Sequence, residues 1–282
     1  MPSNYKDLRD LFDGWLKQSL DSLYLNNILS DSISYMLSAP AKRIRPVLTL
    51  MIGEMLGVEK EDLRPYCLAI EYLHNSTLIH DDLPALDNDD FRRGLETCHK
   101  KFGEANAILA ADLMIGSAFS QIALAETVVA EVRVIWSDLL SSAYMNICNG
   151  QALDIKHAKV ATSVEQLEVI DLQKTAALFV SAIIGPTALI EQEQREVIIP
   201  KLSEFACNLG LLFQITDDII DYNEQDKEAE DSELNYVKLL GREAAHKRST
   251  EIYDKSLDIL NELSYDSSQI KMLLERVLTR KE

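Results

Sequence analysis

The sequence contains few of the residues that tight turns require. Only 10 of its 282 residues are glycine and 7 are proline. Chains built of many short strands need both residues at their turns, so this composition disfavours an all-β fold. Hydrophobic residues make up 47% of the chain and charged residues 26%, which excludes extensive disorder. A largely helical globular protein is therefore expected.

Cysteine and long apolar runs are also scarce. The four cysteines, Cys67, Cys98, Cys148 and Cys207, are far apart and form no CxxC pair, which excludes a zinc knuckle or a dense disulfide framework. The longest uncharged apolar run, residues 175–190, has 16 residues, and a bilayer span needs ~20. The first residues lack the apolar core of a signal peptide. We expect a cytoplasmic protein without a membrane span.

Positive charge is in the minority. The chain has 28 Lys and Arg against 46 Asp and Glu, which gives a net charge of −18. Such a field repels phosphates, so the chain is expected to bind neither nucleic acid nor an anionic membrane surface. A phosphate ligand would need local cations or metal ions that reverse this field.

The apolar residues recur at helical spacing. One stripe is formed by Leu202, Phe205, Ala206, Leu209, Leu212, Phe213, Thr216 and Ile220, and another by Leu63, Cys67, Ile70, His74, Thr77 and Asp81. Residues 105–125 and 175–190 are apolar nearly all round, which is typical of helices inside a helical assembly. The patterns predict an all-α fold, with residues 1–282 forming a single domain.

A first acidic cluster follows an apolar segment. Asp81 and Asp82 precede Pro84, and Asp87 follows it. Since proline disfavours a helical conformation at the residue before it, we expect the helix to end near Asp82 and Asp87 to fold back. Negative charge is unfavourable at a helix C-terminus. Carboxylates in this position indicate a nearby cation.

A second acidic cluster, Asp217, Asp218 and Asp221, follows directly after an apolar stripe. The spacing places the three carboxylates on one helix face. Two carboxylates ~5 Å apart repel each other by about 3 kcal/mol at an effective dielectric constant of ~20, and Mg²⁺ would remove that repulsion. The alternative for both clusters is a solvated helix face. The apolar stretches before them favour metal binding.

Two basic islands stand out in this acidic chain: Lys42 with Arg43 and Arg45, and Arg92 with Arg93. Arginine suits phosphate oxygens because it donates two parallel hydrogen bonds. The alternative is ordinary surface solubility. Lys174 and Thr175 lie at the rim of a pocket or simply start a helix, and His74 is a ligand or a hydrogen-bonded core residue. Carboxylates, cations and an apolar interior together indicate a substrate with a diphosphate head and a hydrocarbon tail.

Five segments of the chain carry motifs: residues 42–46 (KRIRP), 80–94 (HDDLPALDNDDFRRG), 150–154 (GQALD), 174–175 (KT) and 213–221 (FQITDDIID). Together they resemble the trans-isoprenyl diphosphate synthases, or polyprenyl synthetases, of the bacterial and plastid branch. The resemblance runs over nearly the whole chain. It implies an isoprenoid synthase fold with a deep central apolar cavity. It also implies Mg²⁺-dependent condensation of isopentenyl diphosphate with allylic diphosphates in a homodimer.

The resemblance also implies roles for individual residues. Three Mg²⁺ ions, present once substrate is bound, would be held by Asp81, Asp82, Asp87, Asp217, Asp218 and Asp221. The allylic diphosphate would be held by Arg92, Lys174, Thr175 and Gln214, of which Thr175 and Gln214 would face the reacting carbons. Isopentenyl diphosphate would be held by Lys42, Arg45, His74 and Arg93. The implied catalytic set is Asp81, Asp82, Asp87, Arg92, Lys174, Thr175, Gln214, Asp217 and Asp218.

The chain differs from the family pattern in two places. Pro40-Ala41 stand where paired glycines are usual, and Glu233 stands where a loop lysine is usual. Lys227 is the only lysine between Asp221 and Lys238, so we assign the missing lysine's role on the allylic diphosphate to Lys227. The alternative is a catalytically weak homologue that acts as a regulatory or binding subunit of a prenyl synthase.

Small residues before the first acidic cluster predict the product length. Ser76 and Thr77 lie five and four residues before Asp81, about one helical turn of ~5.4 Å away. Since both are small, we expect a farnesyl tail to pass them, with Leu73 and Ile70 as the next obstacles. The prediction is geranylgeranyl diphosphate (C20), with farnesyl diphosphate (C15) as the alternative.

Overall fold

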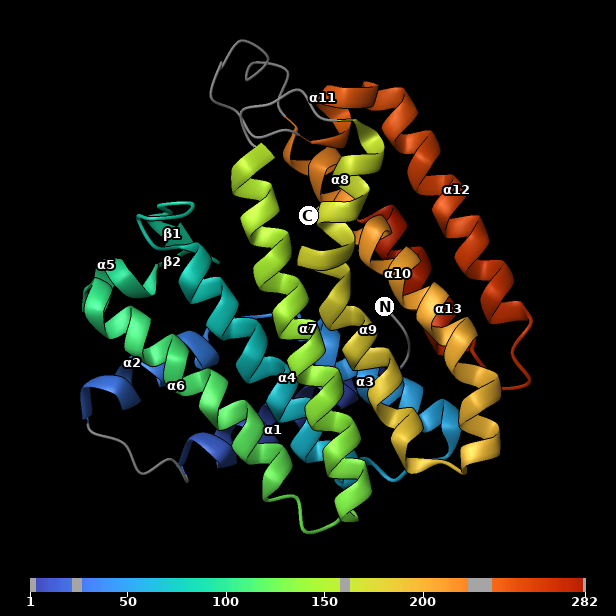
Figure 1. Cartoon of the computed structure of the whole chain (residues 1–282), viewed down its shortest axis with the longest axis horizontal. Helices are drawn as coiled ribbons and strands as arrows, with labels where there is room; N and C mark the ends of the chain where they lie inside the picture. The colour runs from blue at the N-terminus through green and yellow to red at the C-terminus, as the bar shows by residue number, and fades with distance from the viewer. Residues whose placement is uncertain (1–3, 22–26, 158–162, 223–234, 281–282) are drawn as a thin grey trace. The chain divides into compact units, whose positions relative to one another are not determined.

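The computed structural model describes residues 4–21, 27–157, 163–222 and 235–280, and nearly all of its regular structure is helical (Figure 1). The all-α prediction is confirmed. The chain divides into two compact units, which we call the N-terminal unit (Asn4–Asp138) and the C-terminal unit (from Leu139 onward). The assignment of residues 1–282 to a single domain and the central cavity stay predictions.

The N-terminal unit is built around one long helix. Its elements are α1 (Tyr5–Asp21), α2 (Asn27–Ser38), α3 (Ile44–Leu56), α4 (Lys60–Asp81), β1 (Phe91–Arg92), β2 (Leu95–Glu96), α5 (Cys98–Phe102), α6 (Glu104–Ala123) and the first part of α7 (Ala130–His157). Helix α4 packs against α3 and α6. In its predicted stripe, Leu63, Cys67 and Ile70 are fully buried, whereas the members nearer the C-terminal end, His74, Thr77 and Asp81, are half-buried. Helix α4 ends at Asp81, three residues before Pro84, as predicted.

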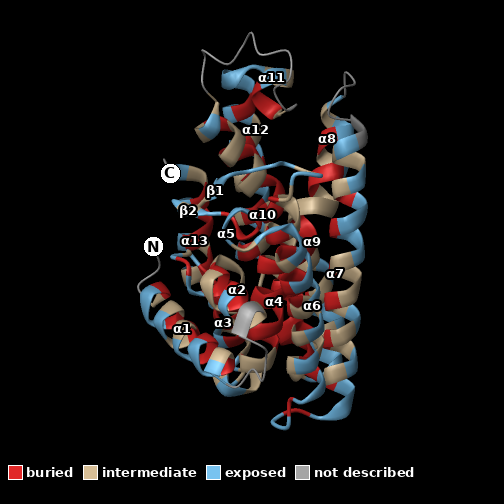
Figure 2. Cartoon of the chain, turned by 90° about the vertical axis from the view of Figure 1, so that its left-hand side faces the viewer, coloured by how far each residue is buried: buried red, intermediate tan, exposed pale blue. Residues whose placement is uncertain are grey.

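Helix α6 differs from its prediction. Ala107, Ala111 and Met114 are buried, but Ile108 and Leu109 are 42% and 53% exposed, so the helix is not enclosed (Figure 2). An all-round apolar sequence does not specify which face packs, and here the small alanines lie on the buried side. By length and hydropathy alone α6 could also cross a membrane, a test that core helices of soluble proteins pass as well. The absence of a membrane span stays a prediction.

The second basic island forms a small hairpin that the sequence did not predict. Strands β1 and β2 pair antiparallel, with Phe91 opposite Glu96 and Arg92 opposite Leu95. Arg93 and Gly94 make the two-residue loop, and both have positive φ, 54° and 76°. That pattern is typical of a type I′ turn, whose twist matches the strands.

The C-terminal unit carries the second acidic cluster. Besides the remainder of α7, it contains α8 (Val164–Asp171), the π-helix η1 (Leu172–Ala176), α9 (Ala177–Ile184), the 3₁₀-helix η2 (Gly185–Leu189), α10 (Gln192–Asp221), α11 (Tyr236–Leu240), α12 (Arg242–Asn261) and α13 (Ser268–Thr279). Helix α9 is buried along its length, which confirms the interior position predicted for residues 175–190. The long helix α10 packs against α9, α12 and α13.

Candidate active site

The first acidic cluster is held at the C-terminal end of α4. The Asp82 side chain is fully buried, and Arg92 Nε donates to its Oδ1 at 2.5 Å. Asp82 Oδ2 has no hydrogen-bond partner. Burial raises the pKa of Asp82 to about 6, although the charge and hydrogen bond of Arg92 act in the opposite direction. A solvated helix face is therefore wrong for Asp82.

Asp81 and Asp87 are brought together by the loop. The Asp87 N–H donates to the Asp81 carbonyl oxygen at 2.9 Å, so the chain folds back after Pro84 as predicted. Asn88 takes a left-handed conformation at φ 55°, which closes this loop. Asp81 is half-buried and Asp87 is exposed. Together with Asp82 they place carboxylates at one helix end, where the helix dipole does not stabilise them.

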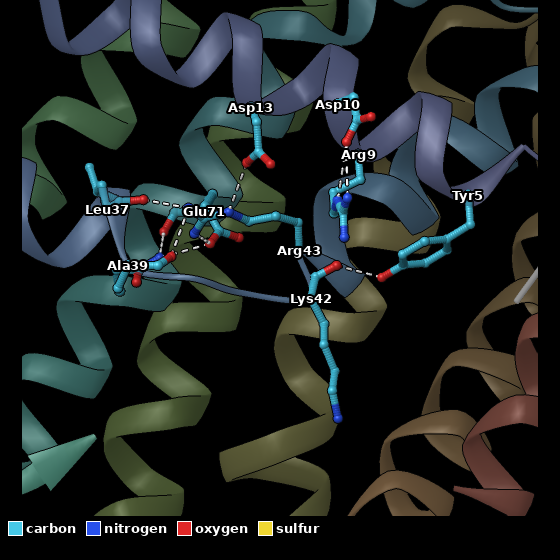
Figure 3. Close-up of polar contacts among 10 residues, drawn as sticks. Tyr5, Arg9, Asp10, Asp13, Leu37, Ala39, Lys42, Arg43 and Glu71 are labelled. Carbon is cyan, nitrogen blue, oxygen red and sulfur yellow. Dashed lines mark hydrogen bonds and ion pairs between the residues drawn. The ribbon is translucent and has the colours of Figure 1, made fainter. Parts of the chain in front are cut away.

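The two basic islands meet around His74. Arg45 Nη1 lies 3.3 Å from His74 Nε2. The pKa of His74 is well below its usual value, first because of burial and then because of the charges of Arg45, Arg93, Arg43 and Arg92. His74 is therefore a neutral imidazole among arginines. Lys42 is exposed, and its side chain extends away from that of Arg43 (Figure 3).

The central residue of the first island, Arg43, is a structural clamp that sequence reasoning did not separate from its neighbours. Its guanidinium binds Asp13 on α1 and Glu71 on α4, and it donates to two carbonyl oxygens at the end of α2 (Figure 3). Arg43 and Glu71 are both buried. The sequence shows the basic island but not which arginine turns inward.

The second acidic cluster ends α10. Asp218 accepts from Gln214 Nε2 at 3.0 Å and from the Tyr236 N–H at 2.8 Å, and burial raises its pKa to about 6 against these bonds. Asp217 pairs with Arg280 at 2.8 Å. Asp221, one turn later, is exposed. The three carboxylates lie on the last turn of one helix, as predicted, in three different environments.

Arg280 was not predicted as part of this cluster. Its guanidinium also donates to Thr216 Oγ1 and lies over the Phe213 ring, 4.0 Å from the ring centre. Sixty-three residues separate Arg280 from Asp217, and no sequence motif links them. Lys227 and Glu233 fall outside the described residues.

Lys174 and Thr175 lie in the π-helix η1, and π-helical turns are frequent at functional sites. Lys174 Nζ donates to Asp154 Oδ2 at 2.6 Å. Thr175 Oγ1 donates to Gln214 Oε1 at 3.1 Å, so the two residues expected to face the reacting carbons contact each other. A Cβ on Gly150 would lie 2.5 Å from the Lys174 backbone nitrogen, so only glycine allows α7 to approach η1 this closely. The GQALD and KT segments therefore form one structural unit.

The residues assigned to product length follow one another along α4. Ile70, Leu73 and Ser76 are fully buried, and Thr77 is half-buried. The hydroxyls of Ser76 and Thr77 donate to the carbonyl oxygens of Leu73 and His74, one turn earlier. Both hydroxyls are therefore satisfied within α4. The two residues before Asp81 that were assigned to product length thus have small side chains whose polar atoms are already bonded.

The carboxylates suit a hard cation such as Mg²⁺, which takes oxygen ligands and usually keeps water or substrate oxygens in its shell. The unpartnered Asp82 oxygen fits such a cation. In the part of the chain that the structure describes, no three His, Cys, Asp or Glu side chains lie close enough to hold an ion by themselves. Oxygen atoms from a substrate would have to complete the coordination.

Comparison with known proteins gives one family. The family model described as "Polyprenyl synthetase" matches residues 26–277. The chain is 38% identical to the farnesyl diphosphate synthase of Micrococcus luteus over 262 residues, which cover 89% of both chains. It is 36% identical to the chloroplastic geranylgeranyl pyrophosphate synthase 7 of Arabidopsis thaliana over 261 residues, 87% of this chain and 74% of the relative.

A solved structure agrees with these relatives. The geranyltransferase of Helicobacter pylori, complexed with magnesium and isoprenyl diphosphate, superposes with a TM-score of 0.84 at 28% identity. The match covers 98% of this chain and 95% of that one. The isoprenoid synthase fold is thereby confirmed.

Proposed function

The chain belongs to the polyprenyl synthetase family and is a trans-prenyltransferase, and from this premise we propose that it makes geranylgeranyl diphosphate. The reaction is the repeated head-to-tail condensation of isopentenyl diphosphate with an allylic diphosphate. The relatives include both farnesyl and geranylgeranyl diphosphate synthases, so the C20 product is the part that we propose from this chain's own residues.

The observation that carries the proposal is the buried Asp82 carboxylate, which pairs with the half-buried Arg92. This carboxylate keeps one oxygen without a partner at the end of an apolar helix, and beside it lie Asp81, Asp87 and the arginines around His74. Acidic and basic groups at one helix end suit a diphosphate bound with cations. Buried carboxylate oxygens usually have a partner, and a bound cation would supply one for Asp82.

We assign Mg²⁺ binding to the aspartates of both acidic clusters, Asp81, Asp82, Asp87, Asp217, Asp218 and Asp221, with three ions once substrate is bound. Bound Mg²⁺ supplies charge neutralisation of the leaving diphosphate. Arg92, Lys174 and Lys227 bind the allylic diphosphate and stabilise the negative charge that develops as its C–O bond breaks. Thr175 and Gln214 orient the allylic chain.

Lys42, Arg45, His74 and Arg93 hold isopentenyl diphosphate. Its double bond attacks the allylic cation and forms the new carbon–carbon bond. The released diphosphate takes the proton that is then lost, so the protein supplies no dedicated base. The neutral His74 fits a hydrogen-bonding role, since a second positive charge beside Arg45 would be repelled.

The small side chains of Ser76 and Thr77 support a C20 product. A farnesyl tail that passes them next meets Leu73 and Ile70. The farnesyl diphosphate synthase of Micrococcus luteus supports the alternative of a C15 product. Pro40-Ala41 and Glu233 favour a second candidate, a weakly active regulatory or binding subunit.

The test is a product assay with purified protein, Mg²⁺, isopentenyl diphosphate and dimethylallyl, geranyl or farnesyl diphosphate as primer. Mass spectrometry should find a C20 product from all three primers. A C15 end point would contradict the C20 assignment. No product from a folded protein that Mg²⁺ stabilises against heat would instead support the subunit role.

The same assay on Ser76→Tyr tests the position of the chain-length stop. The bulky ring should shorten the main product by at least one prenyl unit, because it occupies the space that the next unit would fill. Burial of each added unit contributes about 3–4 kcal/mol, which would then be lost. Ser76→Ala is the matched control and should keep the wild-type product. An unchanged product from a folded Ser76→Tyr variant would place the stop elsewhere.

We propose that the protein is a cytoplasmic homodimer. The support for the homodimer is a group of exposed apolar residues in the N-terminal unit, on α6, the segment after it and the start of α7: Ile108, Leu109, Leu124, Val129 and Val134. A second copy of the chain would remove these side chains from water.

A further inference from the structure

We propose that Arg43, through its buried ion pair with Glu71, is the positioning residue for isopentenyl diphosphate. The inference rests on the proposed function. It assigns to the middle arginine of the KRIRP segment a role that differs from those of Lys42 and Arg45. Those two bind substrate, whereas Arg43 fixes the backbone that carries them.

The guanidinium of Arg43 joins three helices to one loop. Nη1 donates to Glu71 Oε1 at 2.6 Å on α4, and Nε donates to Asp13 Oδ1 at 3.1 Å on α1. Nη2 donates to the carbonyl oxygens of Leu37 and Ala39 at the C-terminal end of α2 (Figure 3). A planar, five-donor group can satisfy these acceptors at once, and lysine cannot.

The backbone of Arg43 is held in an unusual conformation. Its φ and ψ are 51° and 37°, in the left-handed region that residues with a side chain rarely adopt. The Tyr5 hydroxyl also donates to the Lys42 carbonyl oxygen at 2.5 Å. The residues that enter α3 are therefore fixed on both sides of this turn. The contacts of the Arg43 guanidinium offset the cost of this backbone conformation.

The partner of Arg43 lies on the helix that carries His74. Glu71 is only 1% exposed, and its Oε1 also accepts from the Asn75 amide at 2.9 Å. Glu71 and His74 are three residues apart on α4 and therefore neighbours on its surface. Arg45 Nη1 lies 3.3 Å from His74 Nε2. The Arg43–Glu71 pair therefore fixes the position of the segment that carries Lys42 and Arg45 relative to the part of α4 that carries His74.

Stability alone does not explain a buried ion pair. Apolar residues of similar size often replace such a pair with no loss of stability, whereas removal of one partner leaves an uncompensated buried charge. The double variant Arg43→Met/Glu71→Leu therefore separates folding from positioning. Arg43→Lys keeps the charge but loses the planar fork.

The experiment is steady-state kinetics on the full-length wild type, both variants and the control Arg9→Met, with thermal melts of each. Arg9 pairs with Asp10 on the exposed face of α1, beside the clamp but outside it (Figure 3). For the double variant we expect a protein that is folded at the assay temperature but melts below the wild type, because the Leu37 and Ala39 carbonyl oxygens lose their donor. We expect its KM for isopentenyl diphosphate to rise about tenfold or more, and its kcat and allylic KM to stay within about threefold. Arg43→Lys should show the same split, and Arg9→Met should match the wild type.

Two outcomes would overturn the inference. In one, the folded double variant keeps the wild-type KM for isopentenyl diphosphate. In the other, kcat and both KM values change together with the fraction of folded protein, as a purely structural pair would require. An inactive wild type would overturn the proposed function and the inference with it. If the wild type is active and only the variants lack the expected change in KM, the inference alone fails.

Discussion

Buried aspartates dominate the electrostatics of single residues in this protein. Asp82 and Asp171 are both buried, and each has one oxygen without a hydrogen-bond partner. Burial raises the pKa of Asp82 to about 6 and that of Asp171 to about 7. Asp82 has Arg92 beside it. The Tyr236 side chain and the charge of Lys174 lower the pKa of Asp171, but the carboxylates of Asp218 and Asp154 raise it further. Asp171 is therefore the more costly of the two to ionise.

The pKa of Asp171 predicts a pH dependence of stability. Its folded value of about 7 lies above the ordinary 3.8, so the folded chain binds more protons than the unfolded chain between these pH values. This contribution to the free energy of unfolding is therefore greatest at low pH, falls as pH rises from about 4 to about 7, and is constant above that. Asp171→Asn should stabilise the protein at pH 8 by about 4 kcal/mol and at pH 4 by much less.

Urea unfolding of wild type and Asp171→Asn at both pH values measures this difference. Asp10→Asn, an exposed aspartate on α1, is the control and should change the free energy of unfolding equally at both. A stability gain of the same size at pH 4 and pH 8 would contradict a raised pKa for Asp171.

At the scale of elements, close helix packing places the catalytic candidates. Gly150 on α7 and Gly210 on α10 both face η1, and a Cβ on Gly210 would lie 2.3 Å from the Ala176 Cβ. The π-helix η1 is thus held between α7 and α10, each of which approaches it closely at a glycine. This contact sets the position of Lys174 against Asp154 and of Thr175 against Gln214.

Gly150→Ala should therefore push η1 away from α7. We expect the free energy of unfolding to fall by about 1–3 kcal/mol, because a backbone atom cannot move aside as a flexible side chain can. The KM for the allylic diphosphate should rise as Lys174 shifts. Gly14→Ala is the matched control, since Gly14 on α1 is an exposed helical glycine with no atom within 4 Å of its added Cβ. The control should gain about 0.5–1 kcal/mol. Chemical unfolding and kinetics on both variants check the prediction, and equal effects of the two substitutions would refute it.

Local sequence patterns predicted where the helices lie better than which helices and side chains contact one another. The end of α4 at Asp81 and the helix face of Asp217 and Asp221 depend on proline chemistry and helical spacing, which a sequence displays directly. The exposure of α6 depends on which neighbours cover an all-round apolar surface. Arg43 and Arg280 meet Glu71 and Asp217 only through the tertiary fold, so no spacing in the sequence marks them.

For the molecule as a whole, a net charge of −18 must be reconciled with anionic substrates. The general field repels diphosphates, but the arginines around His74 form a local region of the opposite sign. Local charge therefore matters more than the sum. An acidic surface also makes copies of the chain repel one another, so apolar contacts have to drive any association between them.

The exposed apolar residues of α6 make such an association testable. In Ile108→Lys/Leu109→Lys, two side chains that a second copy would cover become charged. Burying each apolar side chain stabilises an interface by about 1.5–3 kcal/mol, so their loss should weaken dimerisation by roughly a hundredfold or more. Light scattering should give twice the chain mass of 31.8 kDa for the wild type and 31.8 kDa for the variant. Val169→Lys, at an exposed apolar position on α8, is the control and should remain dimeric. A monomeric wild type, or a double variant that stays dimeric at the same concentration, would show that α6 is not the dimer interface.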